Sequence, residues 1–257
     1  MFQYNKFINK FKLKFINQNH TRNSLRFSVH LAEHCNLNCA GCEHFSPLAE
    51  AKLKNIDIIK NDFSRLSKIT DGIIEELNLH GGEPLLNQQI NDFLLISRKY
   101  FPESRINIMT NGILLDKQTD IFWQICYESN INIIITCYPI QINSNLIMEK
   151  AERFKVKIIY LGDPANKKPE WRKLKIDLNG KQNPILSNNL CYASNFCFQL
   201  VDGKLYKCWR IAYIKYFNNA FKKDLKVIKN DGYIDIYKAR NAIEILNKLK
   251  KPAIFCR

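Results

Sequence analysis

The sequence predicts an α/β fold, in which strands and helices alternate along most of the chain. Residues 25–31 alternate apolar with polar side chains, which is the period of a half-buried strand. Strand character returns at residues 75–80, 105–109, 131–136 and 156–160, and helical periodicity lies between these segments, at residues 56–69, 88–99, 114–127 and 142–154. This alternation predicts parallel strands joined by right-handed crossovers.

Composition indicates an ordinary globular chain in a reducing compartment. The 257 residues can form one large domain, with or without a small one, and 46% of them are hydrophobic. No apolar run approaches the roughly 18 residues that a membrane span needs. The nine cysteines are an odd number and cluster at metal-ligand spacings, which favours the cytoplasm over secretion.

The net charge of +15 raises the question of nucleic-acid binding. Most of the basic residues are lysines scattered along the chain, and no RNA-binding module is visible beyond the charge. We therefore favour solvated lysine faces over a nucleic-acid partner. An RNA-binding or RNA-modifying protein is kept as an alternative, which predicts affinity that falls steeply with salt.

Residues 1–24 form a basic, aromatic N-terminal extension. Lysines interleave with apolar side chains at spacings of three and four, which predicts an amphipathic helix; the apolar residues are Tyr4, Phe7, Ile8, Phe11 and Phe15. Lysines interrupt every candidate core of a signal peptide. We expect the phenylalanine stripe to pack on the protein, and peripheral contact with an anionic membrane is the alternative.

Three cysteines, Cys35, Cys39 and Cys42, follow the first predicted strand at C-x3-C-x2-C spacing. Three thiolates hold three corners of a four-iron cluster and leave one iron open, whereas a structural metal site is normally closed by four ligands. Zinc, with His34 or His44 as the fourth ligand, is the alternative for these three cysteines taken alone.

The second strand, at residues 75–80, is followed by Gly81-Gly82-Glu83-Pro84. Together, the two motifs resemble the radical S-adenosylmethionine (SAM) family over residues 25–180. The resemblance implies a partial (β/α)6 TIM-like barrel and a [4Fe-4S] cluster on Cys35, Cys39 and Cys42, whose open iron binds SAM. Reductive cleavage of SAM then gives a 5′-deoxyadenosyl radical, which abstracts hydrogen from a substrate.

The resemblance also indicates the SAM site. Gly81, Gly82 and Glu83, with Pro84, are expected to hold the SAM amino group, because glycines allow close approach of the backbone to a ligand. Thr110, Asn111 and Thr136 lie at the ends of strands and are candidates for ribose or carboxylate contacts. The alternative reading is that these motifs are simply turns and helix starts.

One position departs from the family pattern. The residue before the third cysteine is commonly aromatic and packs near the adenine, but here it is Gly41, so Phe45 is a candidate for that contact. Cys126 and Cys137 stand alone on apolar elements, and we expect them to be buried small hydrophobic residues.

A second cysteine group lies in residues 181–257, beyond a domain boundary predicted near residue 180. Asp202-Gly203 between two alternating runs predicts a hairpin at residues 197–208, and a helix is expected at residues 234–250. A further strand near residues 171–176 is a candidate sixth strand of the barrel.

The pattern resembles the auxiliary-cluster region of SPASM and Twitch radical SAM proteins. The cysteines of this group are Cys191, Cys197, Cys208 and Cys256. They imply an auxiliary iron–sulfur cluster, either closed by all four thiolates or lacking a final ligand because the chain is a fragment. Zinc and unligated cysteines are the alternatives.

The expected function is therefore that of a radical SAM enzyme with a reducing electron donor such as flavodoxin or ferredoxin. Peptide modification is the first hypothesis for the reaction, and modification of a sugar, polysaccharide or other small molecule is the second. A non-catalytic zinc or iron–sulfur protein is the alternative outside this class.

Overall fold

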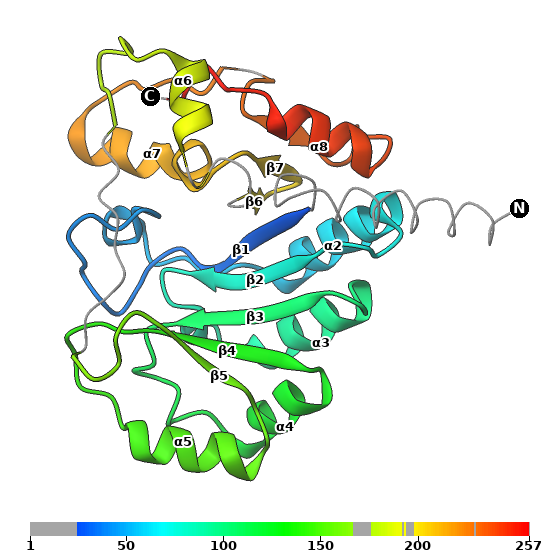
Figure 1. Ribbon diagram of the computed structural model, residues 1–257, viewed down its shortest axis with the longest axis vertical. Helices are drawn as coiled ribbons and strands as arrows, with labels where there is room; N and C mark the ends of the chain where they lie inside the picture. The colour runs from blue at the N-terminus through cyan, green and yellow to red at the C-terminus, as the bar shows by residue number, and fades with distance from the viewer. Residues whose placement is uncertain (1–24, 167–175, 192, 194–197, 229, 257) are drawn as a thin grey trace, which may run out of the picture.

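The computed structural model describes residues 25–166, 176–191, 193, 198–228 and 230–256. One eight-stranded sheet runs through these residues in the order β5-β4-β3-β2-β1-β6-β7-β8 (Figure 1). The strands are β1 (Arg26–Ala32), β2 (Glu76–Gly81), β3 (Arg105–Thr110), β4 (Ile131–Thr136), β5 (Ile158–Leu161), β6 (Phe198–Val201), β7 (Lys204–Tyr206) and β8 (Tyr233–Asp235).

Seven α-helices and two short 3-10 turns are described. The helices are α2 (Ile56–Thr70), α3 (Ile90–Tyr100), α4 (Asp120–Glu128), α5 (Ser144–Arg153), α6 (Pro184–Leu190), α7 (Trp209–Phe221) and α8 (Ala242–Lys250), and the 3-10 turns are η1 (Ser46–Leu48) and η2 (Pro84–Leu86).

The first five strands and β6 are parallel; each of β1 to β4 pairs with the next strand along the chain, and β6 pairs with β1. Right-handed crossovers that always advance in the same direction place their helices on the same face of the sheet. Figure 1 shows α2, α3 and α4 along one face. The sheet remains open, with β5 and β8 at its edges, so the partial-barrel expectation is confirmed as an open parallel α/β fold without closure.

A continuous apolar core lies between this sheet and the helices. Phe27 of β1, Phe63 of α2 and Phe101 meet edge to face, with ring centroids 5.3–6.2 Å apart. All three side chains are fully buried. Burial of each such ring contributes about 1.5–3 kcal/mol, so this cluster fixes β1 firmly against α2.

The four central strands and their helices confirm the sequence prediction within a few residues, except for α4. The predicted helix began at residue 114, but residues 114–119 form turns and α4 begins at Asp120. Lys150 of α5 donates hydrogen bonds to the carbonyls of Asp116 and Gln118, at 2.8 and 2.9 Å. A side chain from a distant helix thus stabilises the turns.

The hairpin prediction is also confirmed, and the hairpin extends the main sheet. Asp202 and Gly203 both have positive φ, at 47° and 73°, as a tight two-residue turn requires. Strand β6 pairs in parallel with β1, and β7 pairs with β8. Because residues 233–235 are needed for this pairing, the helix predicted at residues 234–250 begins only at Ala242, where Asn241 accepts a capping hydrogen bond from the Glu244 amide.

Two of the predicted elements lie wholly or partly outside the described part of the chain. The helix at residues 1–24 lies outside it, and so do residues 171–175 of the suggested sixth strand. The neighbour of β1 on the side away from β2 is β6. The domain boundary near residue 180 stays a prediction.

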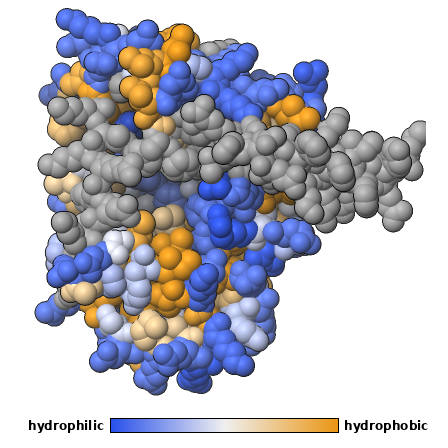
Figure 2. Space-filling view, viewed as in Figure 1, coloured by the Kyte–Doolittle hydropathy of each residue, from blue (hydrophilic) through white to orange (hydrophobic). Residues whose placement is uncertain are grey.

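The surface is polar over most of the face shown in Figure 2. An apolar patch lies over α6, where Ile185, Leu186 and Leu190 are 61%, 57% and 76% exposed. Among the described helices, none is long and apolar enough to cross a membrane.

Candidate cluster and cofactor site

The three cysteines of the first motif lie on one loop at the carboxyl end of β1. Two turn hydrogen bonds shape this loop, from the Cys42 amide to the Cys39 carbonyl at 3.3 Å and from the Phe45 amide to the Cys42 carbonyl at 3.1 Å. All three thiols are free and half-buried. Burial, together with the negative charges of Glu83, Cys39 and Cys42, raises the pKa of Cys35 to about 11.

The Gly81-Gly82 pair lies against the start of this loop. The Gly82 amide donates to the Ala32 carbonyl at 2.9 Å, and the Glu83 amide donates to the His34 carbonyl at 3.1 Å. A Cβ atom on Gly82 would lie 2.0 Å from the His34 oxygen and 2.7 Å from the Cys35 nitrogen. The backbone at Gly82 therefore lies close to the backbone that carries Cys35, and this contact alone requires a glycine here.

Glu83 is completely buried behind the two glycines. Its carboxylate accepts hydrogen bonds from the Thr110 hydroxyl at 2.7 Å, the Asn111 amide at 2.9 Å and the Leu85 amide at 3.2 Å. Burial outweighs these three donors and raises the pKa of Glu83 to about 7. Glu83 also caps η2, in which Pro84 is the first residue. The motif therefore starts a short 3-10 helix, as the alternative interpretation of the sequence expected.

Asn111 joins the end of β3 to the cysteine loop. Its side-chain amide donates to the Asn36 side-chain oxygen at 2.7 Å and lies 3.7 Å from the Cys35 sulfur. The Thr110 hydroxyl donates to Glu83 and accepts from the Gly112 amide at 3.0 Å. Thr136 is half-buried at the same edge of the sheet, paired with Leu161. The ends of β1, β2 and β3 are therefore linked through polar side chains.

Tyr138 is a candidate site residue that the sequence reasoning missed. Burial raises the pKa of its phenol, and negative charges on Cys39, Cys42, Cys35 and Glu83 act in the same direction. Tyr138 comes two residues after Thr136 at the end of β4, and no sequence motif marks it.

Gly41 and Phe45, the two residues considered for the adenine contact, have other environments. Gly41 is exposed in a left-handed conformation, with φ of 78°, and nothing lies within 4 Å of where its Cβ would be. The Phe45 ring packs on Phe217 of α7, with centroids 5.8 Å apart. Phe45 thus contributes to packing of the C-terminal helices.

The two histidines considered as extra zinc ligands are also placed. The His44 ring directs Nδ1 at Nε2 of His30, 2.6 Å away. The Nδ1 atom of His34 is buried and has no hydrogen-bond partner in the described part of the chain.

The second cysteine group is assembled from three separate segments. Cys191 ends α6, Cys208 precedes α7 and Cys256 lies near the end of the described chain. All three thiols influence the pKa of Lys207: burial lowers it, and the cysteines act in the opposite direction. The Lys207 ammonium group is 1% exposed and donates to the Leu249 carbonyl at 2.5 Å. Cys197 lies outside the described residues.

The two remaining cysteines are buried, as expected. Cys126 of α4 is 1% exposed and Cys137 is 7% exposed. Burial raises the pKa of both thiols, which keeps them protonated and unreactive.

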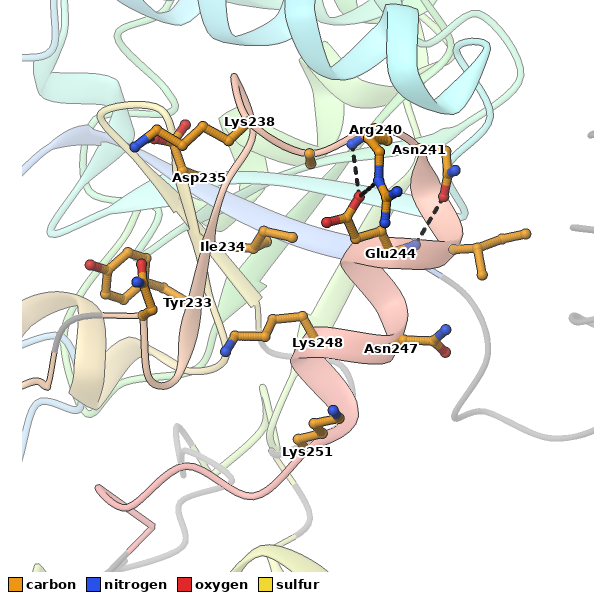
Figure 3. A pocket seen from close by; sticks show the side chains of 13 residues that line it. Tyr233, Ile234, Asp235, Lys238, Arg240, Asn241, Glu244, Asn247, Lys248 and Lys251 are labelled. Carbon is orange, nitrogen blue, oxygen red and sulfur yellow. Dashed lines mark hydrogen bonds and ion pairs between the residues drawn. The ribbon is translucent and has the colours of Figure 1, made fainter.

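A surface groove lies elsewhere, between β8 and α8 (Figure 3). Its volume is about 610 Å3. Lys238, Lys248 and Lys251 line it, and Arg240 is paired there with Glu244 at 3.0 Å. None of the described cysteines is among the residues that line it.

Comparison with known proteins identifies the family and the fold. A family model described as a 4Fe-4S single cluster domain matches residues 23–153, which is about half of the chain. The GTP 3′,8-cyclase of Campylobacter jejuni subsp. doylei is 26% identical over 236 residues, covering 90% of this chain and 68% of the cyclase. The GTP 3′,8-cyclase of Helicobacter pylori is 21% identical over 224 residues, covering 87% and 65%.

A solved structure shares the fold. The crystal structure of BtrN in complex with AdoMet and 2-DOIA superposes with a TM-score of 0.56 and 19% identity, covering 90% of each chain. The family match, the cyclase relatives and this shared fold agree with the two motifs. The chain belongs to the 4Fe-4S single cluster domain family and is a radical SAM enzyme, with a [4Fe-4S] cluster and S-adenosylmethionine as its cofactors.

Proposed function

We propose that Cys35, Cys39 and Cys42 hold the [4Fe-4S] cluster and that the ends of β2, β3 and β4 hold SAM beside it. The observation that carries this proposal is the polar chain that joins Glu83 through Asn111 to Cys35. It links the Gly-Gly-Glu-Pro motif to the cysteine loop through direct contacts, although the two motifs are distant in sequence.

The residues fit the proposed cluster. Three free thiols on one loop match the thiolate ligands that iron–sulfur clusters prefer, and three ligands leave one iron for a substrate or cofactor. Burial raises the pKa of the free Cys35 thiol, and a bound cation would have to overcome this effect to hold it as a thiolate. When bound, the cluster supplies the electron for reductive cleavage of SAM.

The chain's own residues would then position the cofactor. Glu83 offers a buried carboxyl group near the ammonium group of SAM, as the motif implies, and a positive charge there would favour its ionised form. Asn111 orients the loop through Asn36. In this proposal Thr110 acts through Glu83, which its hydroxyl holds, while Gly81, Gly82, Pro84 and Thr136 line the remaining edge of the site.

We propose Tyr138 as the aromatic residue that compensates for Gly41. Negative charges on all three cysteines act on the pKa of its phenol, and an aromatic ring at the end of β4 suits contact with the adenine or ribose. Open space at Gly41 leaves room for a ligand on that side of the loop.

The second cysteine group is proposed to hold an auxiliary iron–sulfur cluster. Support comes from Lys207, on whose pKa Cys191, Cys208 and Cys256 all act and whose ammonium group would offset the negative charge of bound thiolates. Cys197 is the candidate fourth ligand. Zinc remains the alternative for this group, and metal analysis of the purified protein separates the two.

The electron donor is proposed to be a low-potential protein such as flavodoxin or ferredoxin, and the compartment the cytoplasm. Free thiols at both groups support a reducing environment. A nucleic-acid partner is not part of this proposal.

The substrate class is the least constrained part of the proposal. Peptide modification is the first hypothesis from the cysteine pattern. The comparisons favour the alternative of a small polar molecule, because the GTP 3′,8-cyclases are named for a nucleotide and BtrN is solved with 2-DOIA. Incubation of reduced enzyme and SAM with a peptide pool and, separately, with aminocyclitols and nucleotide sugars would test the two classes by product mass.

The decisive experiment for the site is EPR of the anaerobically reconstituted, reduced protein before and after SAM is added. We expect a cluster signal that changes on SAM addition. Cys39→Ala should abolish the SAM-dependent change, whereas Cys126→Ala, which alters a buried cysteine of α4, should retain it. A wild-type spectrum that ignores SAM would contradict the proposed site.

A further inference from the structure

Three histidines meet in the space between the two motifs. His30 is on β1, His44 follows Cys42 by two residues, and His80 directly precedes Gly81 on β2. His30 and His80 are register partners on the neighbouring strands. One ring nitrogen from each residue lies within 4.8 Å of the others. This histidine cluster joins three segments of the chain at a single point.

Glu33 determines which nitrogen of His30 faces the cluster. The Glu33 carboxylate lies 3.0 Å from Nδ1 of His30. The Lys54 ammonium group lies 3.3 Å from the same carboxylate, and a carboxylate in such an ion pair can only accept a hydrogen bond. Nδ1 of His30 therefore carries the hydrogen. In the neutral ring, Nε2 is left with a lone pair directed at His44.

The three rings are arranged around this lone pair. The planes of His30 and His44 differ by 8°, and their facing nitrogens are 2.6 Å apart, so the rings meet edge to edge. The His80 ring is inclined to both, by 63° and 57°. Tyr213 of α7 lies flat on His30, with centroids 4.0 Å apart. The buried Tyr213 hydroxyl has no hydrogen-bond partner within the described ranges.

We propose that His30, His44 and His80 bind a divalent ion of the zinc type. Three neutral imidazoles without a thiolate or carboxylate suit zinc, copper or nickel, and zinc is bound by three histidines in many proteins. The Glu33–His30 contact is the arrangement in which a carboxylate orients a metal-binding histidine through its other ring nitrogen. Burial also lowers the pKa of His30 and His80, which keeps both as neutral ligands.

The competing arrangement is a plain hydrogen-bond chain from His44 through His30 to Glu33. Zinc–nitrogen bonds of about 2.0–2.1 Å in tetrahedral geometry place the ligand nitrogens about 3.3 Å apart. The His30 and His44 nitrogens would thus separate by roughly 0.7 Å, a shift that the loop carrying His44 can provide. The charges nearby also allow an ion at this point. Lys54 pairs with Asp202 at 3.0 Å as well as with Glu33 at 3.3 Å, so Asp202 can neutralise Lys54 while the negative charge of Glu33 stabilises the ion through His30.

An ion at this point would tie the segment after Cys42 to β1 and β2. It would thereby fix the third cysteine relative to the Gly-Gly-Glu-Pro motif, independently of any iron. This role is separate from the proposed cluster and SAM site, which uses none of the three histidines.

The test uses the full chain, reconstituted with iron and sulfide, incubated with zinc and then dialysed. Metal analysis should find about one zinc per chain, and X-ray absorption at the zinc edge should show nitrogen neighbours at about 2.0–2.1 Å without a sulfur shell at about 2.3 Å. His80→Gln should lose this zinc. His34→Gln, a histidine of the same loop outside the cluster, should retain it.

Three outcomes overturn the proposal: no zinc after dialysis, a sulfur shell that accounts for all of the bound zinc, or equal zinc retention in His80→Gln and wild type. The absorption measurement on the wild-type chain decides the question even if the variant folds poorly. Iron content and the SAM response of the same samples report on the proposed function separately.

Discussion

Cys35, Cys39 and Cys42 share one loop that leaves a central strand, whereas Cys191, Cys208 and Cys256 come from the end of α6, the start of α7 and the C-terminal segment. The first group is shaped by backbone contacts between β1 and β2. The second depends on how a hairpin and three helices pack together. The comparison shows that a local motif can define a site almost alone, while a dispersed site requires the whole tertiary structure.

The largest expected effect separates the two groups by metal content. Cys39→Ala should remove about four irons per chain together with the whole SAM-dependent EPR change, because the first cluster has only three ligands. Cys208→Ala should remove the iron of the second group and leave the SAM response intact. Iron analysis with EPR measures both. Loss of the SAM response in Cys208→Ala would show that the groups are not independent.

Two glycines test how tightly each region is built. Gly82→Ala would bring Cβ within 2.0 Å of a backbone oxygen, and we expect destabilisation of more than about 3 kcal/mol. In the hairpin, the Cβ atom of Gly203→Ala would meet side chains alone, Tyr237 at 2.8 Å and Asp62 at 3.7 Å, and the left-handed turn costs about 1 kcal/mol. Urea unfolding gives both values. Equal losses would contradict the proposed difference in rigidity.

The raised pKa of Glu83 predicts that the unfolding free energy depends on pH through the first region. Its pKa in the folded protein is about 7, above the ordinary value of 4.5, so its contribution is fully present below pH 4.5 and is lost as the pH rises through 7. The unfolding free energy of the cluster-free protein should therefore fall by about 3 kcal/mol between these limits, relative to Glu83→Gln. The exposed control Glu128→Gln should show the same pH dependence of the unfolding free energy as the wild type. If Glu83→Gln also showed the wild-type pH dependence, the raised pKa could not belong to Glu83.

The smallest expected effect concerns the aromatic neighbour of each region. Tyr138→Ala should raise the SAM dissociation constant about tenfold, as expected for loss of one stacked ring, and Tyr138→Phe should restore most of the affinity. Phe45→Ala should lower stability through its contact with Phe217 and leave SAM affinity unchanged. Isothermal titration measures the affinities. If Phe45→Ala were the variant with weaker SAM binding, the contact would belong to Phe45.

The same comparison explains what the sequence could predict. Strands β1 to β4, the cysteine loop and the Gly-Gly-Glu-Pro motif depend on short-range patterns, and their positions were predicted closely. Helix α7 was not predicted, because its apolar residues face several partners and give little periodicity. Strand β8 was assigned to a helix because its pairing with β7 is a tertiary contact.

The site shows the same division. Cys35 and Glu83 stand in recognisable motifs, but nothing in the local sequence indicates that His30, His44 and His80 converge, since they lie on separate segments. Tyr138 also became visible only when the ends of the strands were placed side by side.

Strand β1 has a partner on each side, β2 on one and β6 on the other. A shortened chain that ends before residue 198 would bare the hydrogen-bonding edge of β1, an apolar strand whose last six residues are buried. Exposed edges of this kind recruit other chains and promote aggregation. The C-terminal hairpin thus acts as a protective cover for the strand that bears the cysteine loop, whatever metal its own cysteines bind.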